Sequence, residues 1–283
     1  MLKQLLVPTD GSLEAIIAAR LAAHLAGRTG RMTLLHVTRD TAGTLAAAGI
    51  DAAANVIGGA MGDLTDKESL RVSEEAARIL AATQEALPTP PAVATIAERG
   101  RPSAVILDAL EGGSYDVAVV GTRGRGVILR TMLGSVSDAV VRYATKPVVI
   151  ARQETAHVIL VAADGSPSSL RAIRMAAEIA CQESAPLVVL HSLEAHPSIP
   201  ERLHELTVSL LREACAAASA APRVSQQILV GDPATALVHE TERRRADLIV
   251  IGRTGRTPHP RVTLGTVAHK VATGASASVL VVP

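Results

Sequence analysis

The sequence predicts an α/β protein built from two tandem open parallel five-stranded sheets with helices on both faces. Two observations carry this prediction. Short apolar runs alternate with segments of helical periodicity along the whole chain, which is typical of βαβ units. The series of elements also occurs twice within 283 residues, and a hydrophobic content of 48% is enough to fill two cores. We expect domains at residues 1–152 and 156–283, with the junction in 152–157.

The elements of the first half follow in order. Strands are expected where short apolar runs end in turn residues, at 3–9, 31–37, 93–100, 115–120 and 146–152. Helices are expected where apolar residues recur at helical spacing, at 14–27, 68–87, 101–113 and 135–144. Uninterrupted apolar strands of this kind are buried on both faces of a parallel sheet.

The second half repeats this order. A strand and a helix share 157–181, and the remaining strands are expected at 185–192, 224–231, 246–251 and 277–283. Further helices are expected at 200–220 and 232–245. Both halves open as a strand, an Asp-Gly-Ser turn and a helix, with Asp10 and Asp164 in matching places.

The strand order follows from connectivity. Crossovers between parallel strands are right-handed, and ligands bind where the strand order reverses. If the Asp-Gly-Ser turn after strand one and the glycine-rich loop after strand four serve one ligand, those strands are neighbours. We therefore predict the order 3-2-1-4-5 in each half.

The fifth strands raise a separate point. Both are uncharged, 148–151 and 278–282, and as sheet edges they would invite pairing with another sheet. Pairing of the two halves would cover both edges, and so would a second chain. We expect an intrachain pseudo-dimer and a homodimer of tandem chains.

The loop after the fourth strand carries the strongest functional signal. Gly121 and Gly124 are separated by two residues, nine more follow, and Gly134-Ser135 opens the next helix. Glycine permits a positive φ and close approach of a ligand, and unpaired amides at a helix N-terminus favour an anion. The alternative is a turn with an ordinary serine N-cap. An identical spacing recurs in the second half, at Gly252, Gly255, Gly265 and Thr266, which favours a phosphate site.

Arginines accompany both loops. They either reach phosphates through charge-assisted hydrogen bonds or remain solvated, and the sequence leaves both readings open. These residues are Arg123, Arg125, Arg130, Arg253, Arg256 and Arg261. The run 243–245 ends a helix, where the dipole already favours cations.

Histidines and cysteines in the predicted elements favour structural roles. His36 and His191 occupy equivalent places near strand ends and are expected to be satisfied core residues. Cys181 and Cys215 lack the short spacing of a zinc or redox motif, so we expect buried free thiols in a reducing compartment.

Composition argues against several partners. Lys plus Arg total 28 against 27 for Asp plus Glu, so no net field favours nucleic acid or anionic membrane. There is no Trp or Phe, which removes the aromatic platforms of single-strand binders. No apolar run reaches membrane-helix length and no signal peptide precedes the first strand, so we expect a cytoplasmic protein without nucleic-acid or membrane partners.

Together, the duplicated glycine motif and the Asp-Gly-Ser strand ends resemble those of a tandem universal stress protein, over essentially the whole chain. The resemblance implies ATP binding in both halves, with or without Mg²⁺. The glycines and Ser135 or Thr266 would hold phosphates, Asp10 or Asp164 would lie by the ribose, and Val37 or Ser192 would line the adenine pocket. The full set of implied binding residues is Pro8, Thr9, Asp10, Val37, Gly121, Arg123, Gly124, Gly134, Ser135, Val136, Ala162, Asp164, Ser192, Gly252, Gly255, Gly265, Thr266 and Val267.

The two halves match the family pattern unequally. Pro8-Thr9-Asp10 follows it, whereas the second half has Ala162-Ala163-Asp164 and a Pro-His-Pro run at 258–260 within its loop. Proline removes donors and stiffens the backbone, so the first site ranks above the second.

Three functions remain open from the sequence. The first is a nucleotide-dependent regulatory module of the stress response, without catalytic residues. The second is a slow ATPase, although no Walker-type motif is present. The third is a nucleotide-independent scaffold or small-ligand carrier that uses the apolar, glycine-rich insertion from Thr44 to Met61, for which an extra helical turn and loop, a lid or a partner surface are alternative readings.

Overall fold

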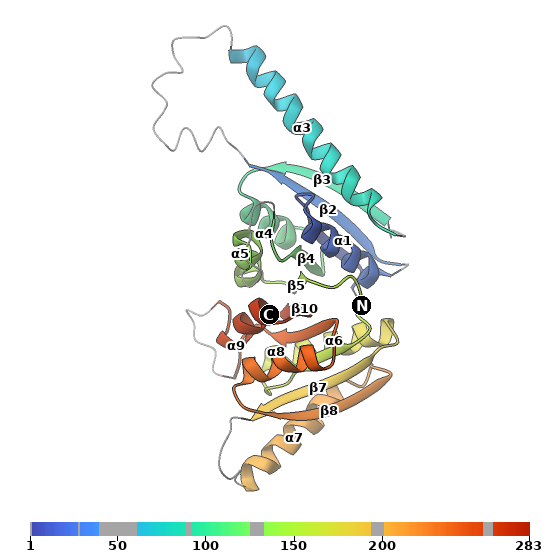
Figure 1. Cartoon of the computed structure of the whole chain (residues 1–283), viewed down its shortest axis with the longest axis vertical. Helices are drawn as coiled ribbons and strands as arrows, with labels where there is room; N and C mark the ends of the chain where they lie inside the picture. Colours follow the sequence, from blue (N-terminus) through green and yellow to red (C-terminus); the bar gives the residue numbers. More distant parts are fainter. Residues whose placement is uncertain are drawn as a thin grey trace.

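The computed structural model describes residues 2–27, 29–39, 61–88, 92–124, 133–193, 201–256 and 263–283. Within these ranges, ten strands form one open sheet in the order β3-β2-β1-β4-β5-β10-β9-β6-β7-β8 (Figure 1). Each half therefore has the predicted order 3-2-1-4-5. Strands within a half are parallel, and β5 pairs antiparallel with β10.

The strands begin and end close to the predicted places. In the first half they are β1 (Gln4–Pro8), β2 (Arg31–Thr38), β3 (Ala92–Arg99), β4 (Val117–Gly121) and β5 (Val148–Ala151). In the second half they are β6 (Ile159–Ala162), β7 (Pro186–Leu193), β8 (Arg223–Val230), β9 (Leu248–Gly252) and β10 (Ser278–Val282).

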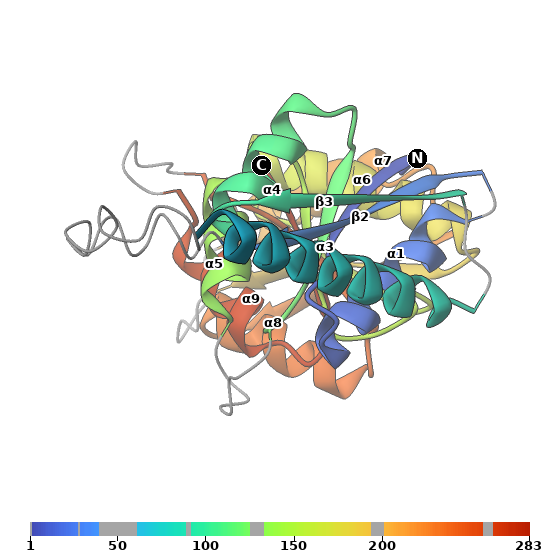
Figure 2. The same cartoon turned by 90° about the horizontal axis from the view of Figure 1, so that it is seen from above.

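The helices lie on both faces of the sheet. In the first half they are α1 (Leu13–Ala26), α3 (Met61–Glu85), α4 (Pro102–Gly112) and α5 (Ser135–Tyr143). In the second half they are α6 (Pro167–Gln182), α7 (Glu201–Ala217), α8 (Pro233–Arg243) and α9 (Thr266–Gly274). Figure 2 shows α3 lying across β2 and β3.

Two apolar cores run through the whole molecule, one on each face of the sheet. The first is formed with α1, α3, α6 and α7, through residues such as Leu21 and Ile173. The second is formed with α4, α5, α8 and α9, through residues such as Val140 and Val271. Each core includes side chains from both halves, so burial of apolar surface holds the halves together.

The junction of the halves is the β5–β10 pair, in which Val149 lies opposite Leu280. The buried hydroxyl oxygen of Ser278 accepts hydrogen bonds from the amides of Arg152 (3.0 Å) and Gln153 (2.9 Å). The predicted pairing of the two halves is therefore present within one chain.

Both cysteines are free, but the expectation of burial is wrong: Cys181 is exposed and Cys215 is partly exposed. Cys181 lies on the face of α6 turned away from the sheet, while Ala177 and Ala180 fill the core positions. Of the apolar insertion from Thr44 to Met61, residues 44–60 lie outside the described residues, and Met61 begins α3.

Within the described part of the chain, no helix combines the length and the apolar character that a membrane crossing requires.

Candidate functional site

The first glycine loop packs against the turn that follows β1. An added Cβ atom at Gly121 would lie 2.8 Å from the carbonyl oxygen of Glu14, in the first turn of α1. A Cβ atom at Gly124 would overlap the Asp10 Oδ2 oxygen. The adjacency of β1 and β4 thus brings Asp10 and the loop together, and the absence of a side chain at both glycines permits this approach.

The glycines of the two motifs do not adopt a left-handed backbone conformation. None of the six glycines of the two motifs, all within the described residues, has a positive φ. Positive φ values occur instead at Gly11 and Gly165, inside the two Asp-Gly-Ser turns. The motif glycines therefore do not use the positive φ that glycine permits, and close packing is their role in this structure.

Gly134 is the N-cap of α5, and its own amide donates a hydrogen bond to the carbonyl oxygen of Thr122 (2.8 Å). That amide is therefore not one of the unpaired donors expected from the sequence. No side chain of the described residues caps the helix, so the amides of Ser135 and Val136 open its first turn without a side-chain acceptor. The hydroxyl of Ser137 donates to the carbonyl oxygen of Gly121 (2.6 Å) and holds the helix start against the end of β4.

Asp10 is fixed by its own turn. Its Oδ1 oxygen accepts hydrogen bonds from the amide (3.0 Å) and the hydroxyl (2.6 Å) of Ser12, which is also the N-cap of α1. Thr9 is buried, and its Oγ1 oxygen lies 3.0 Å from that of Thr83 and accepts from the amide of Gly11 (3.2 Å). The carboxylate of Asp10 is thus placed at the loop, while the side chain of Thr9 is buried and bonded within the protein interior.

The end of β2 is tied to the same turn. The Nδ1 atom of buried His36 lies 2.8 Å from the carbonyl oxygen of Thr9, which confirms the structural role predicted for this histidine. The neighbouring Val37 packs, partly buried, against the core under α4 and α5. Pro8 is the last residue of β1.

The second half repeats this arrangement of a glycine loop, an aspartate turn and a helix start, and we call each of the two arrangements a cradle. A Cβ atom at Gly255 would lie 3.2 Å from Asp164 Oδ2, and the amide of Gly265 donates to the carbonyl oxygen of Arg253 (2.8 Å). Gly265 caps α9 without a side chain, so the amides of Thr266 and Val267 begin the helix as those of Ser135 and Val136 do. Asp164 accepts from the amide of Ser166 (2.8 Å).

The second loop is held more tightly to its helix. The hydroxyl of Ser168 donates to the carbonyl oxygen of Thr254 (2.5 Å), and an added Cβ atom at Gly252 would lie 2.7 Å from that same hydroxyl. Around β6, the hydroxyl of Ser169 donates to the carbonyl oxygen of Ala162 (3.2 Å). These serine hydroxyls have no counterpart at Glu14 and Ala15 in the first half.

At the end of β7, the structure gives two side chains backbone partners. His191 Nδ1 lies 2.6 Å from the carbonyl oxygen of Ala163, as expected for a satisfied core residue. The hydroxyl of Ser192, a predicted lining residue, donates to the carbonyl oxygen of Gly231 (3.1 Å).

The loop arginines divide into separate groups. Arg253 donates to the carbonyl oxygen of Ala144 at the end of α5, across the junction of the halves. Burial and the nearby charge of Arg123 lower the pKa of Arg152 to about 10, which places Arg123 toward the same junction. Arg256 is exposed. The remaining loop positions, Arg125, Arg130, Arg261 and 258–260, lie outside the described residues.

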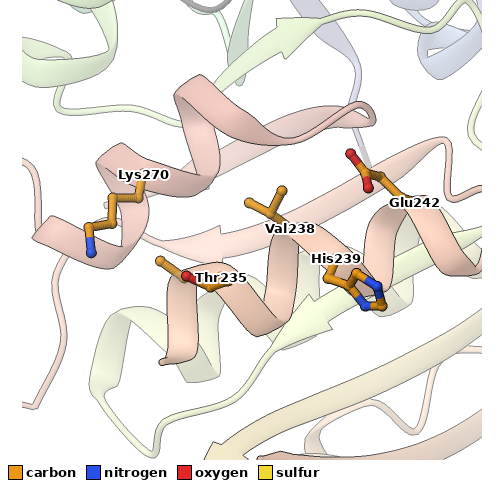
Figure 3. Close-up of a pocket in the computed structure, with 6 residues that line it drawn as sticks. Thr235, Val238, His239, Glu242 and Lys270 are labelled. Carbon is orange, nitrogen blue, oxygen red and sulfur yellow. The ribbon is translucent and has the colours of Figure 1, made fainter. Parts of the chain in front are cut away.

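A shallow pocket of about 310 Å³ lies between α8 and α9 (Figure 3). It is lined by Ala234, Thr235, Val238, His239, Glu242 and Lys270. In Figure 3, the α8 side chains follow one side of that helix, and Lys270 approaches from α9. The pocket contains none of the predicted site residues, and no sequence motif marks it.

Comparisons with known proteins agree with this architecture. A universal stress protein of Mycolicibacterium smegmatis is 33% identical over 184 residues, covering 60% of this chain and 62% of that protein. A universal stress protein of Methanocaldococcus jannaschii is 33% identical over 136 residues, covering 44% of this chain and 80% of that protein. The chain therefore spans less than two thirds of the length of the mycobacterial relative.

Solved structures match the whole chain. A universal stress protein from Archaeoglobus fulgidus aligns over 99% of this chain and 97% of its own with a TM-score of 0.67 and 22% identity. At these identities the likeness shows a shared fold. The sequence model of the universal stress protein family matches residues 1–152 and again 155–283. This chain belongs to the universal stress protein family.

Proposed function

We propose that each half of the chain binds ATP, with the phosphates at the uncapped first turn of α5 or α9, and that nucleotide binding gives the protein a regulatory role in stress survival. The observation that carries the proposal is the duplicated arrangement in which a glycine N-cap, a glycine loop and an aspartate turn meet at one edge of the sheet. An anion at that place is favoured by free amides and by the helix dipole.

The proposed roles follow the positions of the residues. In the first half, the amides of Ser135 and Val136 and the Ser135 hydroxyl would contact phosphate, with Asp10 toward the ribose and Val37 toward adenine. In the second half, Thr266, Val267, Asp164 and Ser192 would take these roles. The choice of adenine rests on the family resemblance, because the amides recognise only the anion.

The first site is proposed to bind more tightly. The hydroxyl of Ser168 already holds the carbonyl of Thr254, so the second loop has less freedom to adjust around a ligand. The hydroxyl of Ser192 is also engaged with Gly231.

A calorimetric titration of ATP into the native chain and Gly134→Asp tests the proposal. Aspartate is a good N-cap, so the variant should keep α5, but its carboxylate would accept the first-turn amides and repel a phosphate. We expect the affinity of the first site to fall at least tenfold, which corresponds to about 1.4 kcal/mol.

Gly112→Asp is the matched control, because the same side chain enters open space at that position. Equal ATP affinity of the native chain and Gly134→Asp would contradict the proposal. Rapid turnover of ATP by the native chain would replace it with an enzymatic function.

A further inference from the structure

Three potential metal ligands meet at the junction of the halves, on the side of the molecule formed by α1 and α6. His24 lies in the last turn of α1, Glu183 is the C-cap of α6, and His157 belongs to the segment that links the halves. Their ligand atoms all lie within 4.8 Å of one another. The three side chains therefore come from three elements that are far apart in the sequence.

The contacts within the group are close. His24 Nε2 is buried and lies 2.8 Å from Glu183 Oε2, and no other group of the described residues bonds this nitrogen. The rings of His24 and His157 stand edge to face with centroids 5.2 Å apart. Two imidazoles and a carboxylate thus face one another, rather than one histidine forming an isolated ion pair.

Neighbouring groups hold the ligands in place. Asp247 Oδ2 accepts hydrogen bonds from the amides of His157 (2.8 Å) and Val158 (3.0 Å). The side-chain amide of Gln182 donates to the carbonyl oxygen of Leu25 (2.6 Å), which joins the ends of α1 and α6. Arg20 pairs with Glu154 at 2.9 Å and fixes the linker to α1.

The local electrostatics favour a cation. Glu183 contributes a carboxylate, Asp247 acts electrostatically on His24, and the C-terminal ends of α1 and α6 both point their negative dipole ends to this place. The side chain of Glu183 is only 10% exposed, so a positive charge beside it would relieve a largely buried carboxylate.

We propose that His24, His157 and Glu183 bind one divalent metal ion of the zinc type, which ties the ends of α1 and α6 to the linker between the halves. Two imidazoles and a carboxylate are a common zinc ligand set, with water in the fourth position. Ligand atoms about 2.0 Å from zinc in a tetrahedron lie about 3.3 Å apart, so the group must contract by at most about 1.5 Å. The exposed His157 side chain supplies that movement.

Zinc uptake by the tag-free, nucleotide-free full chain tests the proposal, with a competing chromophoric chelator to report affinity and Co²⁺ as a spectroscopic substitute. We expect one zinc ion per chain, and His24→Ala, His157→Ala and Glu183→Gln should each lower the affinity at least about tenfold. His239→Ala is the matched control, because His239 is an exposed histidine on α8 outside the group.

His157→Ala is the decisive variant, since it changes an exposed side chain and should leave the apo fold intact. Zinc should raise the melting temperature of the native chain and of His239→Ala, but not that of His157→Ala, because binding to the folded state alone stabilises it. If the three residues form only a His24–Glu183 ion pair, the native chain should take up no stoichiometric zinc. Alternatively, His157→Ala should take up as much zinc as the control. Either result would overturn the proposal, and neither bears on ATP binding.

Discussion

Gly124 is the residue of the first cradle at which a methyl group would meet the Asp10 carboxylate. A Cβ atom there would overlap Asp10 Oδ2, and the other carboxylate oxygen of Asp10 is held by Ser12. In Gly124→Ala the carboxylate must turn away, which displaces the proposed ribose partner at little cost in stability. We expect ATP affinity at the first site to fall at least tenfold, or about 1.4 kcal/mol, as measured by calorimetry.

Two further substitutions complete this comparison. Gly255→Ala should weaken the second site less, because its Cβ atom would lie 3.2 Å from Asp164 Oδ2 and a small shift relieves that contact. Gly112→Ala places a methyl group in open space and should leave ATP binding unchanged. An unchanged first site in Gly124→Ala would show that the Asp10 carboxylate does not matter to the ligand.

At the residue scale, the sequence predicted which glycines belong to the site but not which contacts they make. Spacing and repetition identified Gly121, Gly124 and Gly134, because both follow directly from the chain. The bond from the Gly134 amide to Thr122 depends on how the loop folds back, and periodicity carries no information on that. The roles of His36 and His191 were predictable, since a lone histidine in an apolar strand needs a local partner.

At the element scale, the helices that begin the two cradles start differently from α1, α6 and α8, although α4 also begins without a side-chain cap. Ser12, Ser166 and Asp232 cap α1, α6 and α8 with their side chains, whereas α5 and α9 begin at glycine. The sequence predicted the Asp-Gly-Ser turns before α1 and α6 and the Gly-Ser and Gly-Thr pairs at the starts of α5 and α9, but it did not predict which side chains cap the helices. It did not predict the exposure of Cys181, which depends on how α6 is turned.

Helix α8 provides a prediction on pH. Glu240 is buried and accepts hydrogen bonds from Arg243 (2.7 and 2.6 Å) and from Arg244 (2.5 Å). The pKa of Glu240 lies below its ordinary value of 4.5, mainly because of the hydrogen bonds from Arg243. Burial opposes this shift, and the hydrogen bond from Arg244 adds to it. A lowered folded-state pKa contributes stability above the unfolded value, and this is lost as the pH falls through the folded-state value.

We therefore expect Glu240→Gln to lower the free energy of unfolding most near neutral pH, with the difference from the native chain shrinking below about pH 4.5. Urea unfolding between pH 7 and pH 3 measures this. Glu242→Gln, on the same helix and exposed, is the control and should change the unfolding free energy less at neutral pH. A difference in unfolding free energy that grows as the pH falls would contradict this prediction.

At the scale of the whole molecule, the β5–β10 pair converts two five-stranded sheets into one continuous sheet. Ser278 supports this junction, because its buried hydroxyl oxygen accepts hydrogen bonds from two backbone amides of the segment that follows β5. Ser278→Ala leaves those amides without their acceptor and should lower the free energy of unfolding by about 1–3 kcal/mol. Ser276→Ala, at an exposed neighbouring position, should have a much smaller effect. Equal values for the two variants in urea unfolding would refute this role of Ser278.

The sequence predicted that the two uncharged edges need a partner, because unpaired backbone groups at an apolar edge are costly. It left open whether that partner is the other half or a second chain. The contacts that cross the junction were beyond sequence reasoning. Arg152 donates to the carbonyl oxygen of Ala272 (2.6 Å) and Arg253 to that of Ala144, and only the packed arrangement of α5 and α9 brings these groups together.

Above all, we propose that main-chain amides at the starts of α5 and α9 bind the phosphates of a nucleotide. Amide chemical shifts of ¹⁵N-labelled full chain, followed during an ATP titration, test it most directly. We expect large, saturable shifts at Ser135, Val136, Thr266 and Val267, with the first pair saturating at lower ATP concentration. Unchanged amide signals at all four positions at saturating ATP would contradict the account.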